Sequence, residues 1–113
     1  MKLPYRENSI IKTEKLTNYL LSLTHQEGKS KAKFFRRIGY NELNILKFEQ
    51  ELLKIAKSNE VDMVNKKKSK IVVKYTIYGV VNAPNGKQYK VKTVWAIDSG
   101  SKIPHLATAH PSV

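Results

Sequence analysis

The chain has 113 residues, with 21 lysine and arginine residues against nine acidic ones, a formal net charge of +12 and no cysteine. This length suits one domain with a modest core, and a composition of 41% hydrophobic and 27% charged residues indicates a folded chain and excludes extended disorder. The lack of cysteine excludes disulfides and cysteine-ligated metals. The lack of a long apolar run predicts a cytoplasmic protein without a secretory signal or a segment that spans the membrane.

The predicted elements begin with an extended lead-in over residues 1–12, where Pro4 interrupts any regular pattern. Thr13 has the chemistry of a helix N-cap. Apolar residues then recur with the spacing of a short amphipathic helix, at Leu16, Tyr19, Leu20 and Leu23. A turn from Thr24 to Gly28 contains His25.

The next predicted helix, residues 30–38, is strongly basic. Lys29 to Arg37 holds five of the 21 basic residues in nine positions, and Gly39 is a suitable C-cap. At about 100° per residue, Lys33, Arg36 and Arg37 share the face opposite the phenylalanines, whereas Lys31 projects onto the apolar face. An ionised lysine there must snorkel to solvent, find a partner or take part in chemistry.

The longest predicted helix covers residues 42–57, with Asn41 as its N-cap. Glu49 is expected inside its apolar arc, close in angle to Leu53. Lys31 and Glu49 are therefore candidates for a buried ion pair, which is usually structural. The alternative makes Glu49 a general base.

Beyond Ser58 the hydrophobic period changes from about 3.6 to 2. Strands are expected at residues 60–64, 70–81, 87–97 and 104–109, with a charged loop at 66–69 and turns at 83–86 and 98–101. The prediction is a single α+β domain over residues 1–113, with a helical part (13–58) before a sheet part (59–111). Three N-terminal helices pack on one face of a four-stranded antiparallel sheet.

The other face of the predicted sheet carries basic side chains. Lys74 alternates with the apolar residues of its strand, and Lys90 and Lys92 share one face of the next strand. This face is either a working surface or an ordinary solvated one.

The polar residues do not suggest a metal or a cofactor. The three histidines, His25, His105 and His110, lack ligand spacing, and no carboxylate cluster or phosphate-binding glycine loop is present. Cleavage of RNA without metal needs an acid, a base and cations around the phosphate. Imidazole titrates near pH ~6.5, so His25 suits either proton-transfer role, although a plain surface histidine is an equal alternative.

Two further candidates complete the predicted site. Lys31 would stabilise phosphate charge from a partly desolvated position. Thr108 or His110, at the end of the last strand, would lie on the sheet. Strict alternation places Leu106 and Thr108 on one face, opposite Ala107 and Ala109.

Two blocks of this sequence resemble a known bacterial family. Lys15-Leu-x-x-Tyr-Leu-Leu21, followed by His25-x-x-Gly-x-Ser-Lys-Ala-x-Phe-Phe35 and Gly39, is similar to the N-terminal signature of domain-of-unknown-function family 6883. Lys92-Thr-Val-Trp95 and Pro104-x-Leu-x-Thr-Ala-His-Pro111 resemble its C-terminal signature. The family layout is similar to the barnase, EndoU, colicin and RelE-like ribonuclease toxins.

The resemblance implies a set of signature positions. These are His25, Lys31, Lys92, Thr93, Trp95 and Thr108. His110 stands where the resemblance implies a tyrosine.

A charge of +12 on one domain implies a polyanionic partner, foremost nucleic acid, with an acidic protein or anionic lipid as alternatives. The leading hypothesis is a small metal-independent endoribonuclease toxin, held by an acidic antitoxin or immunity protein, with His25, Lys31, Lys92 and Thr108 in its site. Further RNA contacts are expected from Lys29, Lys33, Arg36, Arg37, Lys74 and Lys90. The alternatives are a non-catalytic nucleic-acid-binding module and a basic protein-interaction subunit.

Overall fold

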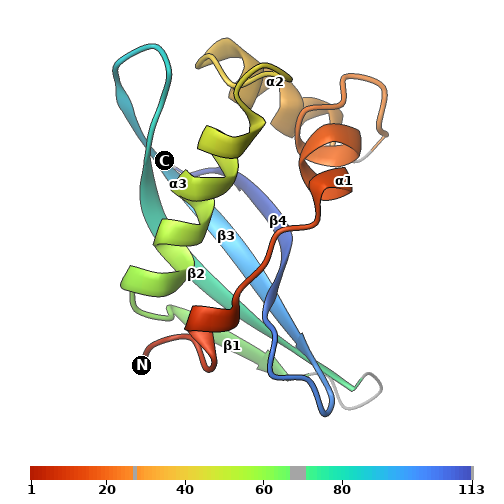
Figure 1. The fold of residues 1–113 in the computed structure, drawn as a ribbon, viewed down its shortest axis with the longest axis vertical. Coiled ribbons are helices and arrows are strands. Elements are labelled where there is room, and N and C mark those ends of the chain that lie inside the picture. The colour runs from red at the N-terminus through yellow and green to blue at the C-terminus, as the bar shows by residue number, and fades with distance from the viewer. Residues whose placement is uncertain (27, 67–70, 113) are drawn as a thin grey trace.

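A computed structural model describes residues 1–26, 28–66 and 71–112 (Figure 1). In chain order its elements are a 3-10 turn η1 (Arg6–Asn8), α1 (Thr13–Lys15), a π-helical turn η2 (Leu16–Leu20), α2 (Lys29–Arg37), α3 (Ile45–Ser58), β1 (Met63–Lys66), β2 (Val72–Asn82), β3 (Gln88–Asp98) and β4 (His105–Pro111). The strands form one four-stranded sheet in the order β1-β2-β3-β4, and all three pairings are antiparallel. The α+β class and the four-stranded antiparallel sheet are confirmed.

The first helix is shorter and less regular than predicted. Thr13 is its first helical residue, not its N-cap, and the α-helical geometry gives way to a π-helical turn after Lys15. The Leu21 N–H donates to the Leu16 carbonyl at 2.8 Å, which ends the helix. Leu23 therefore lies outside it and is 50% exposed.

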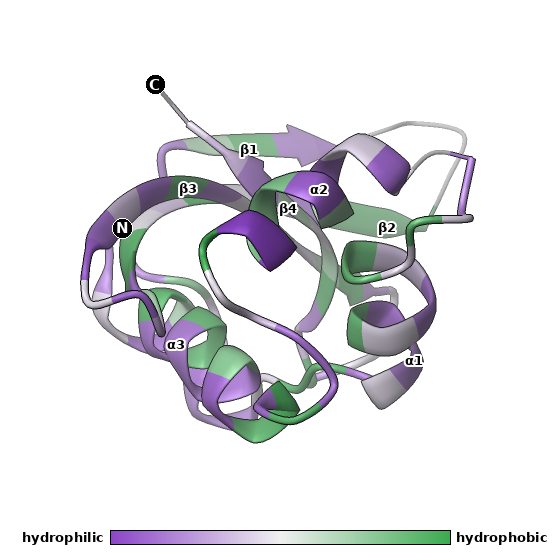
Figure 2. Cartoon of the chain, turned by 90° about the horizontal axis from the view of Figure 1, so that it is seen from above, coloured by the Kyte–Doolittle hydropathy of each residue, from purple (hydrophilic) through white to green (hydrophobic). Residues whose placement is uncertain are grey.

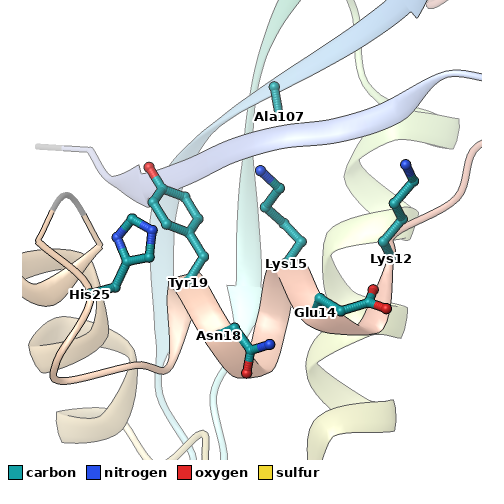
Figure 3. A pocket seen from close by; sticks show the side chains of 7 residues that line it. All are labelled: Lys12, Glu14, Lys15, Asn18, Tyr19, His25 and Ala107. Atoms are coloured by element: carbon teal, nitrogen blue, oxygen red, sulfur yellow. The ribbon is translucent and has the colours of Figure 1, made fainter.

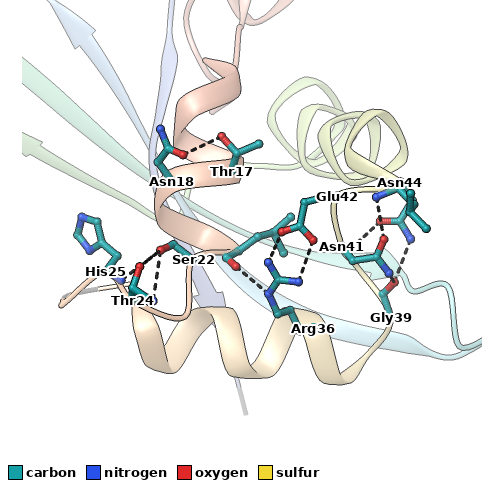
Figure 4. Close-up of polar contacts among 12 residues, drawn as sticks. Thr17, Asn18, Ser22, Thr24, His25, Arg36, Gly39, Asn41, Glu42 and Asn44 are labelled. Atoms are coloured by element: carbon teal, nitrogen blue, oxygen red, sulfur yellow. Dashed lines mark hydrogen bonds and ion pairs between the residues drawn. The ribbon is translucent and has the colours of Figure 1, made fainter.

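The long helix starts three residues later than predicted, because two asparagines hold a separate turn in front of it (Figure 4). The Asn41 side chain accepts the N–H of Leu43 at 2.8 Å, and the Asn44 side chain accepts the N–H of Asn41 at 2.8 Å. Gly39, predicted as the C-cap of α2, is the residue after the observed C-cap Ile38, and it has a φ of 113°.

The strand boundaries also shift by a few residues. Glu60, predicted to lie in the first strand, forms an isolated β-bridge with Lys2, and β1 begins at Met63. Lys66, assigned to the charged loop, ends β1. The rest of that predicted loop, and the predicted strand start at Lys70, lie outside the described residues.

The inner face of the sheet packs against α3. Ile77 and Val81 of β2 and Val91 and Trp95 of β3 are fully buried there. Gly79 brings the two layers together, because a Cβ at this position would lie 2.6 Å from the Ile55 side chain. Helix α3 carries apolar residues beside polar ones, as its colours in Figure 2 show.

The buried carboxylate of α3 is Glu51 and not Glu49. Glu51 is 3% exposed, and it accepts hydrogen bonds from the backbone N–H of Asn82 at 2.7 Å and from Lys54 at 3.0 Å. The predicted pair of Lys31 with Glu49 is wrong, because no ion pair joins them among the described residues and Lys31 has other partners.

The lead-in is part of the fold and not a loose extension. The Leu3 side chain is fully buried in the core. Ile10 pairs with the start of β4, donating to the Pro104 carbonyl at 2.9 Å and accepting from the Leu106 N–H at 3.2 Å. The lead-in thus covers part of the outer edge of the sheet, which would otherwise expose unpaired backbone groups.

Candidate functional site

The π-helical turn η2 places Tyr19 beside strand β4. Leu16 and Leu20 are buried, and Tyr19 between them is half-buried and points toward the strand that carries Ala107 (Figure 3). Single π-helical turns often occur at functional sites, since they change which residues face a neighbouring element.

The Tyr19 hydroxyl contacts side chains from two other elements, Lys31 of α2 and Thr108 of β4. The Lys31 ammonium of α2 donates a hydrogen bond to this hydroxyl and another, at 3.0 Å, to the hydroxyl of Thr108 in β4. The two hydroxyl oxygens of Tyr19 and Thr108 are 3.3 Å apart and hydrogen-bonded. This explains the lysine on the apolar side of α2: its charge is held by two hydroxyl groups at the edge of the sheet.

Lys15 and His25 also lie beside the phenol ring of Tyr19. The ammonium nitrogens of Lys31 and Lys15 lie 4.8 and 4.9 Å from the ring centroid. The His25 ring meets it edge-on, with centroids 4.8 Å apart. We call Lys15, Tyr19, His25, Lys31 and Thr108 the Tyr19 cluster.

The Tyr19 cluster borders an open pocket of about 630 Å³. Lys15, Tyr19 and His25 line it, and Figure 3 shows its other lining residues, Lys12, Glu14, Asn18 and Ala107. Two lysines and a histidine line the pocket against one carboxylate, that of Glu14, so the pocket suits an anionic group.

The surroundings of Tyr19 favour its ionised form. Burial alone would raise the pKa of the phenol. The hydrogen bonds from Lys31 and Thr108, together with the positive charges of Lys31 and Lys15, outweigh burial and lower the pKa of Tyr19 below its ordinary value.

The loop that carries His25 is tightly held. The His25 backbone N–H donates to the Ser22 hydroxyl at 3.1 Å (Figure 4), and its ring Nδ1 accepts the N–H of Gly28 at 3.0 Å. This hydrogen bond assigns the proton of the neutral imidazole to Nε2. A Cβ on Gly28 would lie 2.4 Å from the Tyr19 carbonyl oxygen, so only glycine allows this approach.

A β-bulge sets the direction of Thr108. The register between β3 and β4 shifts at Val94 and Trp95, which pair with Thr108 and Leu106, so Ala107 is the extra residue. Leu106 therefore faces the core and Thr108 does not, and the prediction that they share a face is wrong. Bulges commonly re-aim side chains in this way.

The outer face of the sheet continues from Thr108. His110, the next outward residue of β4, pairs with Lys92, which in turn pairs with Tyr78 of β2. Diagonal neighbours in a sheet lie about 7–8 Å apart, so Lys92 is close to the Tyr19 cluster.

The register also places Lys74 and Lys90 on this face, as predicted, with the Lys90 ammonium 5.4 Å from the centre of the Tyr78 ring. The predicted residues of α2 differ in accessibility. Lys29, Lys33 and Arg37 are exposed, whereas Arg36 is half-buried and binds the Leu21 carbonyl at 2.7 Å and the carboxylate of Glu42. Arg36 therefore holds α2 against its neighbours, and its contact with RNA stays a prediction.

Two signature residues belong to the core. Thr93 and Trp95 are fully buried; the indole N–H donates to the Thr93 hydroxyl at 2.8 Å, and that hydroxyl donates to the Ile77 carbonyl at 2.7 Å. The signature positions therefore divide into two groups. His25, Lys31, Lys92 and Thr108 lie in or near the candidate site, and Thr93 and Trp95 form a structural pair inside the sheet.

The sequence reasoning missed Tyr19 and Lys15 as site residues. Tyr19 follows the apolar spacing of its helix, which hid its hydroxyl among core positions. The hydroxyl of a buried tyrosine usually finds a hydrogen-bond partner, so a tyrosine on an apolar helix face was a signal for a polar contact there.

In residues 1–26, 28–66 and 71–112, no three histidine, cysteine or acidic side chains gather as a metal site would require. Over the same ranges, no helix has the length and apolar character needed to span a membrane.

One solved structure shares this fold over nearly its whole length. A chain of a contact-dependent growth inhibition toxin–immunity protein complex from Klebsiella pneumoniae 342 matches with a TM-score of 0.70 and 14% sequence identity. The match covers 98% of the present chain and 99% of the other, and at this identity it establishes similarity of fold. The present chain belongs to the family described as domain of unknown function (DUF6883), which it matches over residues 2–113. No curated protein matches it.

Proposed function

We propose that this chain is a small endoribonuclease toxin domain that works without metal in the cytoplasm and is neutralised by an acidic antitoxin or immunity protein. The observation that carries the proposal is the Tyr19 cluster. Two lysines, a histidine and two hydroxyl groups gather beside an open pocket at the edge of a basic sheet face. These are the groups that metal-independent phosphodiester cleavage requires.

The charge of the chain supports the toxin side of a toxin–immunity pair. A domain with a net charge of +12 attracts RNA, because phosphate contacts release counterions. A protein that blocks such a surface has to present the opposite charge. The present chain therefore suits the partner that handles RNA, and an acidic protein suits its inhibitor.

Each predicted residue has a role in this proposal. Lys31 and Lys92 hold the phosphate and offset the negative charge that grows on it. Thr108 keeps Lys31 in place through their 3.0 Å hydrogen bond. His25 acts from the pocket wall as a hydrogen-bond donor and not as a base, because its Nδ1 accepts from Gly28 and the neutral ring carries its proton on Nε2.

The exposed cations Lys29, Lys33, Arg37, Lys74 and Lys90 would extend the contact along the RNA backbone. Such contacts strengthen binding without selecting a sequence.

The test is incubation of the purified chain with total RNA in EDTA. We expect cleavage by the wild type and a loss of about 100-fold or more in His25→Ala and Lys31→Ala. Lys57→Ala removes an exposed lysine at the end of α3 and should cleave normally. Intact RNA with the wild type, or full activity in both site variants, would refute the proposal.

A non-catalytic nucleic-acid-binding module is the second candidate. The outer sheet face favours it, because Lys90 lies over Tyr78, Lys92 pairs with Tyr78 and Lys74 is on the same face, and such a face can both stack bases and hold phosphates. This candidate predicts tight, salt-dependent RNA binding with no cleavage by the wild type.

A further inference from the structure

We propose that Tyr19 is the general acid of the reaction, donating its phenolic proton to the leaving 5′ oxygen of the RNA. This inference rests on the proposed function and names a catalytic residue for it. In the proposed function, His25 offers this oxygen only the N–H of a neutral imidazole, which is a weaker acid than a phenol, since Nδ1 of His25 accepts the Gly28 N–H. Protonating His25 at that nitrogen would break the bond that holds its loop.

The position of the phenol suits the task. Tyr19 lines the open pocket, and its hydroxyl accepts a hydrogen bond from the Lys31 ammonium. An oxygen that accepts from an ammonium keeps its own proton available for donation. The side chain is half-buried, so it is fixed in place and still reachable.

The electrostatics favour the charge that this donation creates. When the proton leaves, the phenolate oxygen remains hydrogen-bonded to Lys31 and Thr108, with the Lys15 ammonium 4.9 Å from the ring centroid. These groups are in place before the reaction and need no rearrangement as charge develops. The lowered pKa of Tyr19 has the same physical origin.

The 2′ oxygen of the RNA loses its proton to water and bonds to phosphorus, and the bond between phosphorus and the 5′ oxygen breaks. The electron pair of that bond goes to the 5′ oxygen, which takes the Tyr19 proton. The products are a 2′,3′-cyclic phosphate and a 5′-hydroxyl, and the phenolate regains a proton from water. Lys31 thereby stabilises the phenolate in addition to contacting the phosphate.

The experiment compares Tyr19→Phe with the wild type on two versions of one RNA oligonucleotide that the wild type cleaves. One version has the natural linkage, and the other has sulfur in place of the leaving 5′ oxygen. A thiolate leaves without protonation, so an acid is needed only for the natural linkage. We expect the cleavage rate of Tyr19→Phe to fall about 10²–10⁴-fold on the natural linkage and less than about 10-fold on the sulfur linkage.

The control is Tyr75→Phe, which removes the hydroxyl of a half-buried tyrosine in β2 and should cleave both linkages like the wild type. An equal loss on both linkages in Tyr19→Phe, or no loss on either, would overturn the assignment of the acid while leaving the ribonuclease proposal intact. A wild type that cleaves neither linkage, nor total RNA, would overturn the proposed function itself.

Discussion

Replacing Glu51 by glutamine should destabilise the fold by about 1–2 kcal/mol at pH 7. The carboxylate is 3% exposed and accepts the Asn82 N–H at 2.7 Å, and glutamine keeps this acceptor but not its charge. A hydrogen bond to a charged group contributes about 1.5–3 kcal/mol against about 1 for a neutral one. The ion pairs with Lys54 and Lys47, at 3.0 and 3.4 Å, add at most about 1 kcal/mol each, because both lysines are exposed.

The stability lost in Glu51→Gln should depend on pH. Burial alone would raise the pKa of Glu51, but the hydrogen bonds from the Asn82 backbone and Lys54 and the charges of both lysines outweigh it and lower the pKa. A carboxyl whose pKa is lowered by folding stabilises the fold above its unfolded pKa, about 4.3, and loses this contribution as the pH falls through the folded value. The difference between wild type and Glu51→Gln should therefore shrink below pH ~4.

Urea unfolding at pH 7 and pH 3 measures both effects. The matched control is Glu49→Gln, which changes a half-buried carboxylate of the same helix and should stay within about 0.5 kcal/mol of the wild type. Equal stability of Glu51→Gln and the wild type at pH 7, or the same difference at both pH values, would refute the reasoning.

Three other substitutions test the packing around the site and the sheet. Gly28→Ala places a methyl carbon 2.4 Å from the Tyr19 carbonyl oxygen, so we expect a loss of about 1–3 kcal/mol in urea unfolding; an unchanged midpoint would show that the loop can yield. Gly79→Ala places a methyl carbon 2.6 Å from the Ile55 side chain of α3, so we expect a similar loss of stability and an altered tryptophan fluorescence. Native fluorescence and stability would contradict the close approach. Arg36→Met should lower stability by about 1–3 kcal/mol, whereas the exposed Arg37→Met should stay within about 0.5, and the reverse order in thermal melts would contradict the structural assignment of Arg36.

The sheet was the most predictable part of the fold. Alternation of apolar residues and the Asn85-Gly86 turn are local signals, and they placed β2 and β3 within one or two residues of their observed ends. The same alternation failed at Ala107, because a bulge is set by pairing with β3 and has no mark in the sequence of β4 itself.

The candidate site was predictable residue by residue but not as an assembly. Lys31 was identifiable as a misplaced charge, but its partner depends on the π-helical turn that directs Tyr19 toward β4. Similarly, helical spacing placed Glu49 in the apolar arc of α3, whereas the actual orientation of the helix on the sheet buries Glu51. Local patterns give the period of a helix, and tertiary packing decides its rotation.

The hydrogen bond between Tyr19 and Thr108 joins residues 89 positions apart, and Thr108 belongs to the last strand in chain order. During synthesis, a chain that has released only the helices and the hairpin of β2 and β3 contains Tyr19 and Lys31 but cannot yet bring Thr108 to them. Contacts of such long sequence separation form late, after the loops between them have closed. The Tyr19 cluster is therefore complete only in the fully folded chain.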